Sequence, residues 1–156
     1  MFDTFRSSSK LINTFTGHTS IVNSIDYSTF DDRQFICSGP SDGTVRVWDI
    51  DNNKKFQSFN AYSCFVNCVK FSSYLYYNYR RHVICFSSWD ETIGFLDFKH
   101  KKLEIFNGHD GGVYGIEFSP FYGGRYLCSG SVDKTIRLWD VETSESLHVF
   151  NGHEDY

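Results

Sequence analysis

The chain has 156 residues, a net charge of −4 and a sequence pI of about 5.8. This charge favours neither nucleic acid nor a membrane surface as a partner. Residues 1–10 lack the apolar core of a signal peptide, and no run of about 18 apolar residues could span a bilayer.

In chain order, residues 1–9 are polar and Ser-rich, so we expect a loose lead-in there. From residue 10 the chain repeats. Residues 37–49 return almost unchanged as residues 128–140 and in a degraded form as residues 85–97. Repeats of roughly 20 to 50 residues indicate a solenoid, a propeller or another array.

Each repeat divides into short runs that are separated by turn residues. In the first repeat the runs are residues 21–27, 34–38, 44–50 and 55–59, and the Asp42-Gly43 pair between the second and third is a hairpin signal. Aromatic residues make up 19% of the chain, which favours strands. Since no helical period is visible, we predict an all-β meander of four antiparallel strands per repeat.

The first run of each repeat carries apolar residues three positions apart, such as Val22 and Ile25. A regular strand would place these two on opposite faces. If both point inward, one extra residue must form a β-bulge between them. The bulge would turn the flanking Ile21 and Asn23 toward the loop end of the sheet.

The second repeat is longer, and its extra residues lie at 72–82, a stretch rich in Tyr and Arg. One interpretation is an aromatic and basic loop that grips a partner or RNA. The other, which we favour, is a tolerated loop insertion.

Four polar side chains interrupt the apolar pattern of the first repeat, and four equivalent ones interrupt the third. Trp only donates, Asp only accepts, and Ser and neutral His do both, so each set can form one chain of hydrogen bonds. The sets are His18, Ser38, Asp42 and Trp48, and His109, Ser129, Asp133 and Trp139.

Ser38, His18 and Asp42 could also indicate a hydrolase triad. Against an enzyme, the set recurs in two repeats, ends on a Trp each time, and lacks a nucleophile elbow. A buried structural network is therefore the preferred interpretation, and we predict no catalytic residue.

The order Gly-His, Ser-x-x-x-Asp, Trp-Asp resembles the WD40-repeat family over residues 10–156. The resemblance implies four-stranded β-propeller blades and a His–Ser–Asp–Trp network that staples each blade. It divides the chain into repeats at 10–50, 51–98 (degenerate) and 99–141, followed at 142–156 by an outer strand and the start of a further repeat.

The middle repeat departs from this pattern, with Tyr62, Phe86, Asp90 and Leu96 at the network positions. A partly satisfied buried network is worse than none, so their joint loss is consistent. We expect Asp90 to persist as a turn residue and the blade to be held by packing.

Residues 10–15 resemble the outer strand of a preceding blade. A closed propeller has typically four to eight blades. Three blades therefore predict an incomplete propeller, which either self-associates or takes its missing blades from another chain. A fragment without an independent role is the alternative function.

The family pattern and the expected bulge together place three positions per blade on one rim. We predict a non-catalytic scaffold that presents this rim to protein partners, with Phe65, Trp89 and Tyr114 as aromatic anchors. The rim positions are Ile21, Asn23 and Ser41, then Phe65, Asn67 and Trp89, then Gly112, Tyr114 and Val132, and Tyr156 would match Ile21 in a further repeat.

Five cysteines occur, and Cys37, Cys85 and Cys128 take equivalent places in the three repeats. This indicates small buried residues rather than disulfides, and free thiols imply an intracellular protein, cytoplasmic or nuclear. Cys64 and Cys68 have no second pair beside them, so we predict no metal site, and no cofactor motif is present.

Overall fold

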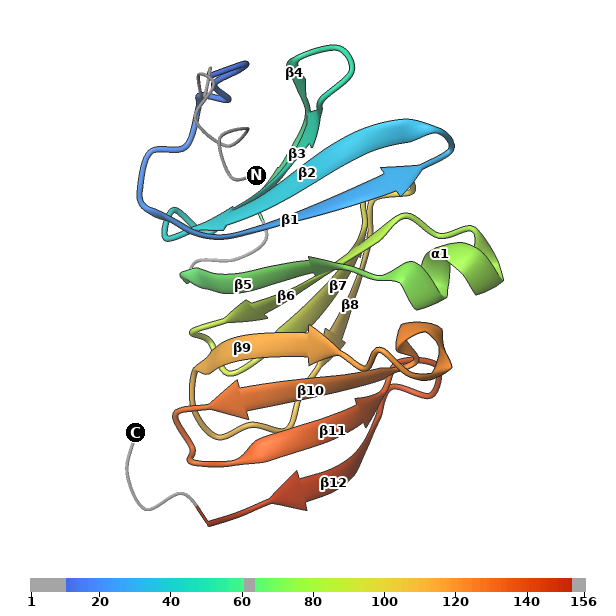
Figure 1. Ribbon diagram of the computed structural model, residues 1–156. Helices are drawn as coiled ribbons and strands as arrows, with labels where there is room; N and C mark the ends of the chain where they lie inside the picture. Colours follow the sequence, from blue (N-terminus) through green and yellow to red (C-terminus); the bar gives the residue numbers. More distant parts are fainter. Residues whose placement is uncertain (1–10, 61–63, 153–156) are drawn as a thin grey trace, which may run out of the picture.

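The computed structural model describes residues 11–60 and 64–152. Its strands form three antiparallel sheets of four strands each, and in every sheet the spatial order follows the chain order (Figure 1). The predicted fold class is confirmed, because the three sheets are blades of an incomplete β-propeller.

The first blade contains β1 (Val22–Phe30), β2 (Arg33–Pro40), β3 (Thr44–Asp49) and β4 (Lys54–Asn60). The second contains β5 (Val66–Phe71), β6 (Val83–Ser88), β7 (Ile93–Asp97) and β8 (Lys102–Phe106). The third contains β9 (Val113–Phe118), β10 (Tyr126–Ser131), β11 (Ile136–Asp140) and β12 (Glu145–Phe150). A helix, α1 (Ser73–Tyr79), follows β5, and a short 3₁₀ turn, η2 (Tyr122–Gly124), follows β9.

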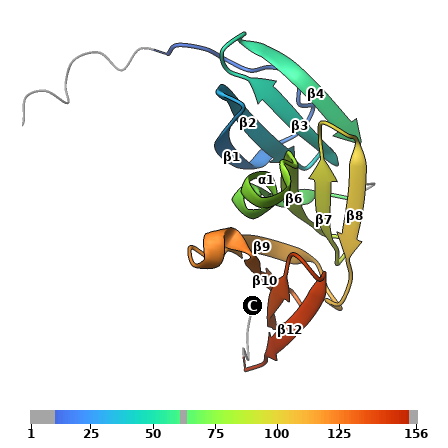
Figure 2. The same ribbon diagram turned by 90° about the vertical axis from the view of Figure 1, so that its right-hand side faces the viewer.

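The blades are arranged as a fan, with the first strands β1, β5 and β9 side by side on its inner edge (Figure 2). One apolar cluster lies between the first two blades and a second lies between the last two. Cys37, Val45 and Val47 of the first blade meet Val66 and Val69 of the second, and all five are fully buried. Burial of such apolar surface is the main force that holds successive blades together.

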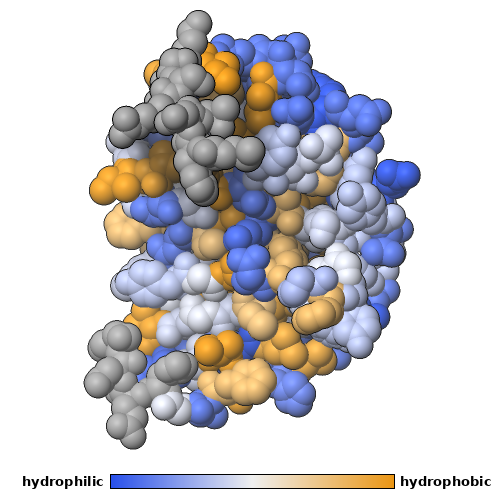
Figure 3. Space-filling model, in the orientation of Figure 1, coloured by the Kyte–Doolittle hydropathy of each residue, from blue (hydrophilic) through white to orange (hydrophobic). Residues whose placement is uncertain are grey.

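The two outer faces of the fan have no neighbouring sheet within the described residues. Ile25 of the first blade is 65% exposed, whereas its equivalent in the second blade, Val69, is fully buried. At the other end Cys128 and Ile136 are exposed, and Figure 3 shows hydrophobic side chains over the strands of this last blade. The expected burial of Cys128 is therefore wrong, because a neighbouring blade is what buries its equivalent Cys37.

The expectation of a loop without helical structure at residues 72–82 is also wrong, because α1 forms there. The Ser72 side chain accepts a hydrogen bond from the backbone N–H of Leu75 and caps the helix, which ends at Arg80 in a left-handed conformation. A helix of seven residues is not stable by itself. It persists because Tyr76 packs in the first apolar cluster and Tyr74 and Leu75 pack in the second.

Residues 11–15 do not form the outer strand expected at 10–15, although Lys10 lies outside the described residues. A strand needs a partner for its backbone groups, and no described strand pairs with this segment. Phe15 nevertheless packs on Trp48, with ring centroids 5.4 Å apart. Among the described residues, α1 and η2 are too short to cross a membrane.

Candidate binding groove and its supporting network

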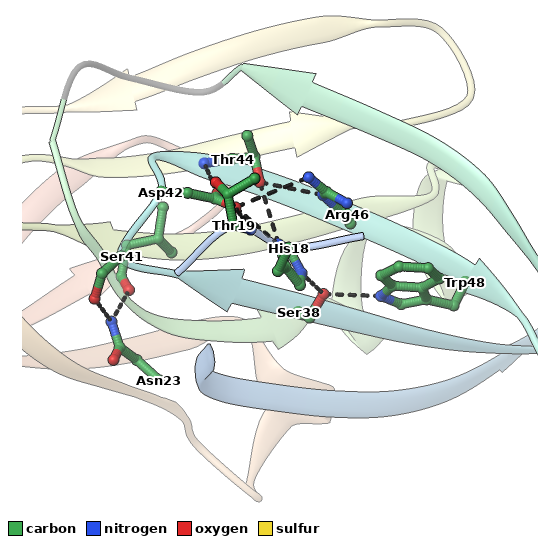
Figure 4. A network of polar contacts seen from close by, with 10 residues as sticks. His18, Thr19, Asn23, Ser38, Ser41, Asp42, Thr44, Arg46 and Trp48 are labelled. Atoms are coloured by element: carbon green, nitrogen blue, oxygen red, sulfur yellow. Dashed lines mark hydrogen bonds and ion pairs between the residues drawn. The ribbon is translucent and has the colours of Figure 1, made fainter. Parts of the chain in front are cut away.

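Four side chains of the first blade form a continuous chain of hydrogen bonds (Figure 4). The indole N–H of Trp48 donates to Oγ of Ser38 at 2.8 Å, and the Ser38 hydroxyl lies 2.6 Å from Nε2 of His18. Nδ1 of His18 lies 3.2 Å from a carboxylate oxygen of Asp42. Since the Ser38 oxygen accepts from Trp48, its proton points to Nε2, and His18 must carry its own proton on Nδ1.

The third blade repeats this geometry with Trp139, Ser129, His109 and Asp133, at 2.8, 2.7 and 2.7 Å for the successive contacts. Burial lowers the pKa of His109 below its ordinary value, although the hydrogen bond with Asp133 opposes the shift. The imidazole is therefore neutral at pH 7, which the acceptor role of Nε2 requires.

The carboxylate at the end of each chain also holds two loops together. Asp133 accepts from the backbone N–H and the hydroxyl of Thr135, at 2.9 and 2.7 Å, and from the backbone N–H of Asp110 at 3.1 Å. Burial opposes ionisation of Asp133, but the hydrogen bonds from Thr135 and His109 outweigh it and hold the pKa of Asp133 far below its ordinary range. Each network therefore fixes the Gly-His loop against the Ser-Asp turn.

The middle blade lacks the network and fills its place with an aromatic ring. Phe86 faces Gly94 across β6 and β7, whereas Ser38 faces Arg46 and Ser129 faces Arg137 in the other blades. A Cβ atom on Gly94 would overlap the ring of Phe86, so the glycine is what admits the larger residue. This role of Gly94 was not predicted, although a glycine where both other repeats have Arg was a visible signal.

Two further network positions of the middle blade are Asp90 and Leu96. Leu96 is buried, and Asp90 accepts from the backbone N–H and the hydroxyl of Thr92 at 3.2 and 2.6 Å. Asp90 thus retains the turn contacts that Asp133 makes with Thr135. Tyr62 lies outside the described residues.

Ser38 is poorly placed to act as a nucleophile. It is 3% exposed, and its oxygen accepts from Trp48 while its proton is directed to His18. Because both the oxygen and the proton of Ser38 are engaged in the network, the geometry favours a structural role for Ser38, His18 and Asp42 over a catalytic one.

The predicted β-bulges are confirmed in all three first strands. The pairing register shifts between Val22 and Ser24 and between Val66 and Cys68, and β9 shows the equivalent shift opposite Gly130 and Ser131. The extra residues are Asn23, Asn67 and Tyr114. The bulges place these three side chains at one edge of the fan.

A groove of about 460 Å³ opens at this edge and crosses all three blades. The other predicted rim residues, Ile21, Gly112 and Val132, do not line it, and Tyr156 lies outside the described residues. The groove is lined by Asn23, Ser41, Phe65, Asn67, Trp89 and Tyr114.

The same backbone hydrogen bond closes the rim in each blade. Ser41 donates to the carbonyl of Ile21 at 2.9 Å, and Trp89 donates to that of Phe65 at 3.0 Å. In the third blade Val132 donates to Gly112 at 3.0 Å. These bonds fix the turns that carry Ser41 and Trp89 against the strands beside them.

The aromatic side chains of the groove are about half exposed, with 53% for Phe65, 43% for Trp89 and 57% for Tyr114. The rings of Trp89 and Tyr114 meet edge to face, with centroids 5.4 Å apart. Trp89 lies against Gly112, where a Cβ atom would come within 2.9 Å of Cε3. Gly112 therefore leaves the space that the indole occupies.

Asn23 and Asn67 tie successive blades together. Nδ2 of Asn23 donates to the carbonyl of Val66 at 2.8 Å and to Oγ of Ser41 at 3.0 Å. Nδ2 of Asn67 donates to the carbonyl of Val113 at 2.9 Å. The relative position of the blades, and so the width of the groove, depends on these amides.

Comparison with known families gives a match to the WD domain, G-beta repeat, at residues 9–49 and 100–140. The chain belongs to the WD40 family. The two matched WD40 repeats are those that carry the hydrogen-bonded networks, and the unmatched region between them contains Phe86 and Leu96.

Several curated WD40 relatives align with most of this chain. Periodic tryptophan protein 2 of Arabidopsis thaliana is 31% identical over 91% of the chain, which is 15% of that relative. The ribosome biogenesis protein WDR12 homolog of Nematostella vectensis is 28% identical over 91% of the chain, or 33% of the relative. The nuclear distribution protein PAC1 of Candida albicans is 31% identical over 78% of the chain, or 24% of the relative. The chain thus spans a third or less of each of these proteins.

WD40 domains generally mediate protein–protein interactions and are generally not catalytic. The groove fits this general role because it combines exposed aromatic side chains with a rigid backbone frame. In the described part of this WD40 chain, no group of three or more His, Cys, Asp or Glu side chains could hold a metal ion.

Proposed function

We propose that this WD40 chain is a non-catalytic scaffold that binds a segment of a partner protein in the groove. The observation that carries the proposal is that six rim positions from three blades line one groove. A site formed by three blades exists only while the blades keep their relative positions. The hydrogen bonds of Asn23 and Asn67 to the neighbouring blades help to hold those positions.

The aromatic side chains would supply most of the binding free energy. Binding hot spots are enriched in Trp and Tyr, because these rings bury a large area with few rotatable bonds. Trp89 and Tyr114 are already held in contact, and Gly112 backs the indole, so little conformational entropy is lost when a partner covers them.

The printed names of two relatives refer to ribosome biogenesis and nuclear distribution. By analogy we place this chain inside the cell, in the cytoplasm or the nucleus, with protein partners and without a metal or cofactor. Neither a nucleic acid nor a membrane is required by the groove, since none of its six residues is charged.

A second candidate is association through the outer faces of the fan, with another chain or with a second copy. The exposed Ile25 and Ile136 favour it, because their equivalents Val69 and Val45 are fully buried between blades. In this case the chain would have no independent role. Light scattering during size exclusion tests the idea, and a monodisperse monomer that binds no hydrophobic dye would exclude it.

The groove is tested by capture of partners from a cell extract with the full chain as bait. Trp89→Ala or Tyr114→Ala should weaken capture by about 2 kcal/mol, or roughly 30-fold, if these residues are hot spots. Tyr77→Ala is the matched control, because Tyr77 is an exposed aromatic residue on α1, at the opposite end of the sheets (Figure 1).

Lys54→Ala, at the start of β4, is a second control that should leave capture unchanged. Circular dichroism of each variant must remain that of the wild type. Capture that survives both groove changes but is lost in Tyr77→Ala would place the binding face at the other end of the sheets.

A further inference from the structure

The two side-chain amides of the groove present their oxygens, rather than their N–H groups, to a ligand. The carbonyls of Val66 and Val113 can only accept, so they fix Nδ2 of Asn23 and Asn67 toward themselves. The second N–H of Asn23 is directed to Oγ of Ser41. Oδ1 of Asn23 points away from both partners (Figure 4), and no described residue donates to Oδ1 of Asn67. The amides therefore present acceptors.

The rest of the lining is uncharged and mixed in character, because the hydroxyls of Ser41 and Tyr114 can donate or accept and the indole N–H of Trp89 donates. Among the described residues that line the groove none is basic, and three are aromatic. The face of an aromatic ring carries negative charge density, which attracts a cation.

A guanidinium group matches this set better than an ammonium group. It is planar, stacks on aromatic rings, carries five N–H donors and is weakly hydrated, so it loses little on entering an apolar groove. Oδ1 of Asn23 and Oδ1 of Asn67 can each accept one of these donors. An ammonium group is compact and strongly hydrated, and it cannot stack.

We infer that the groove recognises the guanidinium group of an arginine in the bound segment, stacked against the paired rings of Trp89 and Tyr114 and hydrogen-bonded to the amide oxygens of Asn23 and Asn67. The inference rests on the proposed function, because it names the side chain that the same groove receives. An acidic or phosphorylated segment would find no basic side chain among the lining residues.

The test uses the full chain and four capped tripeptides, N-acetyl-Ala-X-Ala-amide with X as arginine, citrulline, lysine or glutamate. Citrulline keeps the shape of arginine and removes its charge. Of the three tryptophans Trp48 and Trp139 are buried and Trp89 is exposed, so a change in fluorescence reports on the groove. The arginine peptide should bind at least tenfold more tightly than the citrulline and glutamate peptides, and more tightly than the lysine peptide.

Variants separate this inference from the proposed function. Tyr114→Ala should abolish the preference for arginine over citrulline, and Tyr77→Ala should preserve it. If the arginine and citrulline peptides bind alike, or neither binds, while partner capture still depends on Trp89, the inference is wrong and the proposed function stands. If capture is also independent of Trp89 and Tyr114, both are wrong.

Discussion

Removing the carboxylate of the third-blade network should destabilise the protein more than removing its counterpart in the middle blade. Asp133 accepts four hydrogen bonds, from Nδ1 of His109, the N–H of Asp110, and the N–H and hydroxyl of Thr135. Asp90 accepts two, from the N–H and hydroxyl of Thr92. Asp133→Ala and Asp90→Ala therefore form a matched pair.

The difference in unfolding free energy between the two variants follows from the hydrogen bonds that Asp133 makes and Asp90 does not. The two turn bonds contribute about 1–3 kcal/mol in either blade, at about 0.5–1.5 kcal/mol each. Asp133→Ala also leaves the buried Nδ1–H of His109 without its carboxylate acceptor, which costs about 1–3 kcal/mol more. We expect the two variants to differ in unfolding free energy by about 1–3 kcal/mol.

Urea unfolding of the full chain, followed by circular dichroism, measures this difference. Thr92→Val removes the turn bond alone, whereas Thr135→Val also removes a contact of its hydroxyl with Nδ1 of His109 at 3.3 Å, so Thr135→Val should cause the larger loss. Equal losses for Asp90→Ala and Asp133→Ala would refute the view that the network is a stabilising unit, as would a network variant that matches the wild type.

Three other outcomes are expected. Burial lowers the folded-state pKa of His109 below 6.5, so the unfolded chain binds more protons than the folded chain below that pH. The urea concentration at the unfolding midpoint should therefore be lower at pH 5.5 than at pH 7.5. A higher midpoint at pH 5.5 would contradict a buried neutral imidazole. A bulky maleimide should modify Cys128 well before Cys37 and Cys85, as read by peptide mass spectrometry, and protection of Cys128 would mean that its face is covered. Leu75→Ala should lower the unfolding free energy, measured in urea, by about 2–5 kcal/mol, because Leu75 of α1 is buried in the apolar cluster between the second and third blades. A loss below about 0.5 kcal/mol would show that α1 contributes little to the core.

The parts of the fold that could be predicted are those that one repeat determines by itself. Donors and acceptors at fixed spacing specified the networks, and the three-residue spacing of Val22 and Ile25 specified the bulge that carries Asn23. The exposure of Cys128 could not be predicted this way, because burial of its face depends on a neighbouring blade. Helix α1 was missed because its stability comes from tertiary packing, which a run as short as α1 does not display as a helical period.

The groove was predictable in part. The bulge and the repeat pattern predicted that the six lining residues lie at one edge. They did not show that Asn23 and Asn67 each donate a side-chain hydrogen bond to the neighbouring blade. These hydrogen bonds determine which polar groups of the two side chains remain available to a ligand. The contact of Trp89 with Gly112 likewise joins two blades, and no pattern within one repeat reports it.

The pairing of Phe86 with Gly94 has a consequence for how such blades can change during evolution. Restoring Arg at position 94 first would drive a side chain into the Phe86 ring, while restoring Ser at position 86 first would leave a cavity above a glycine. Both single steps are destabilising even though the double change reproduces the pair found in the flanking blades. The two positions are therefore strongly epistatic, and the Ser and Arg of the flanking blades could be introduced here one at a time only through a destabilised intermediate.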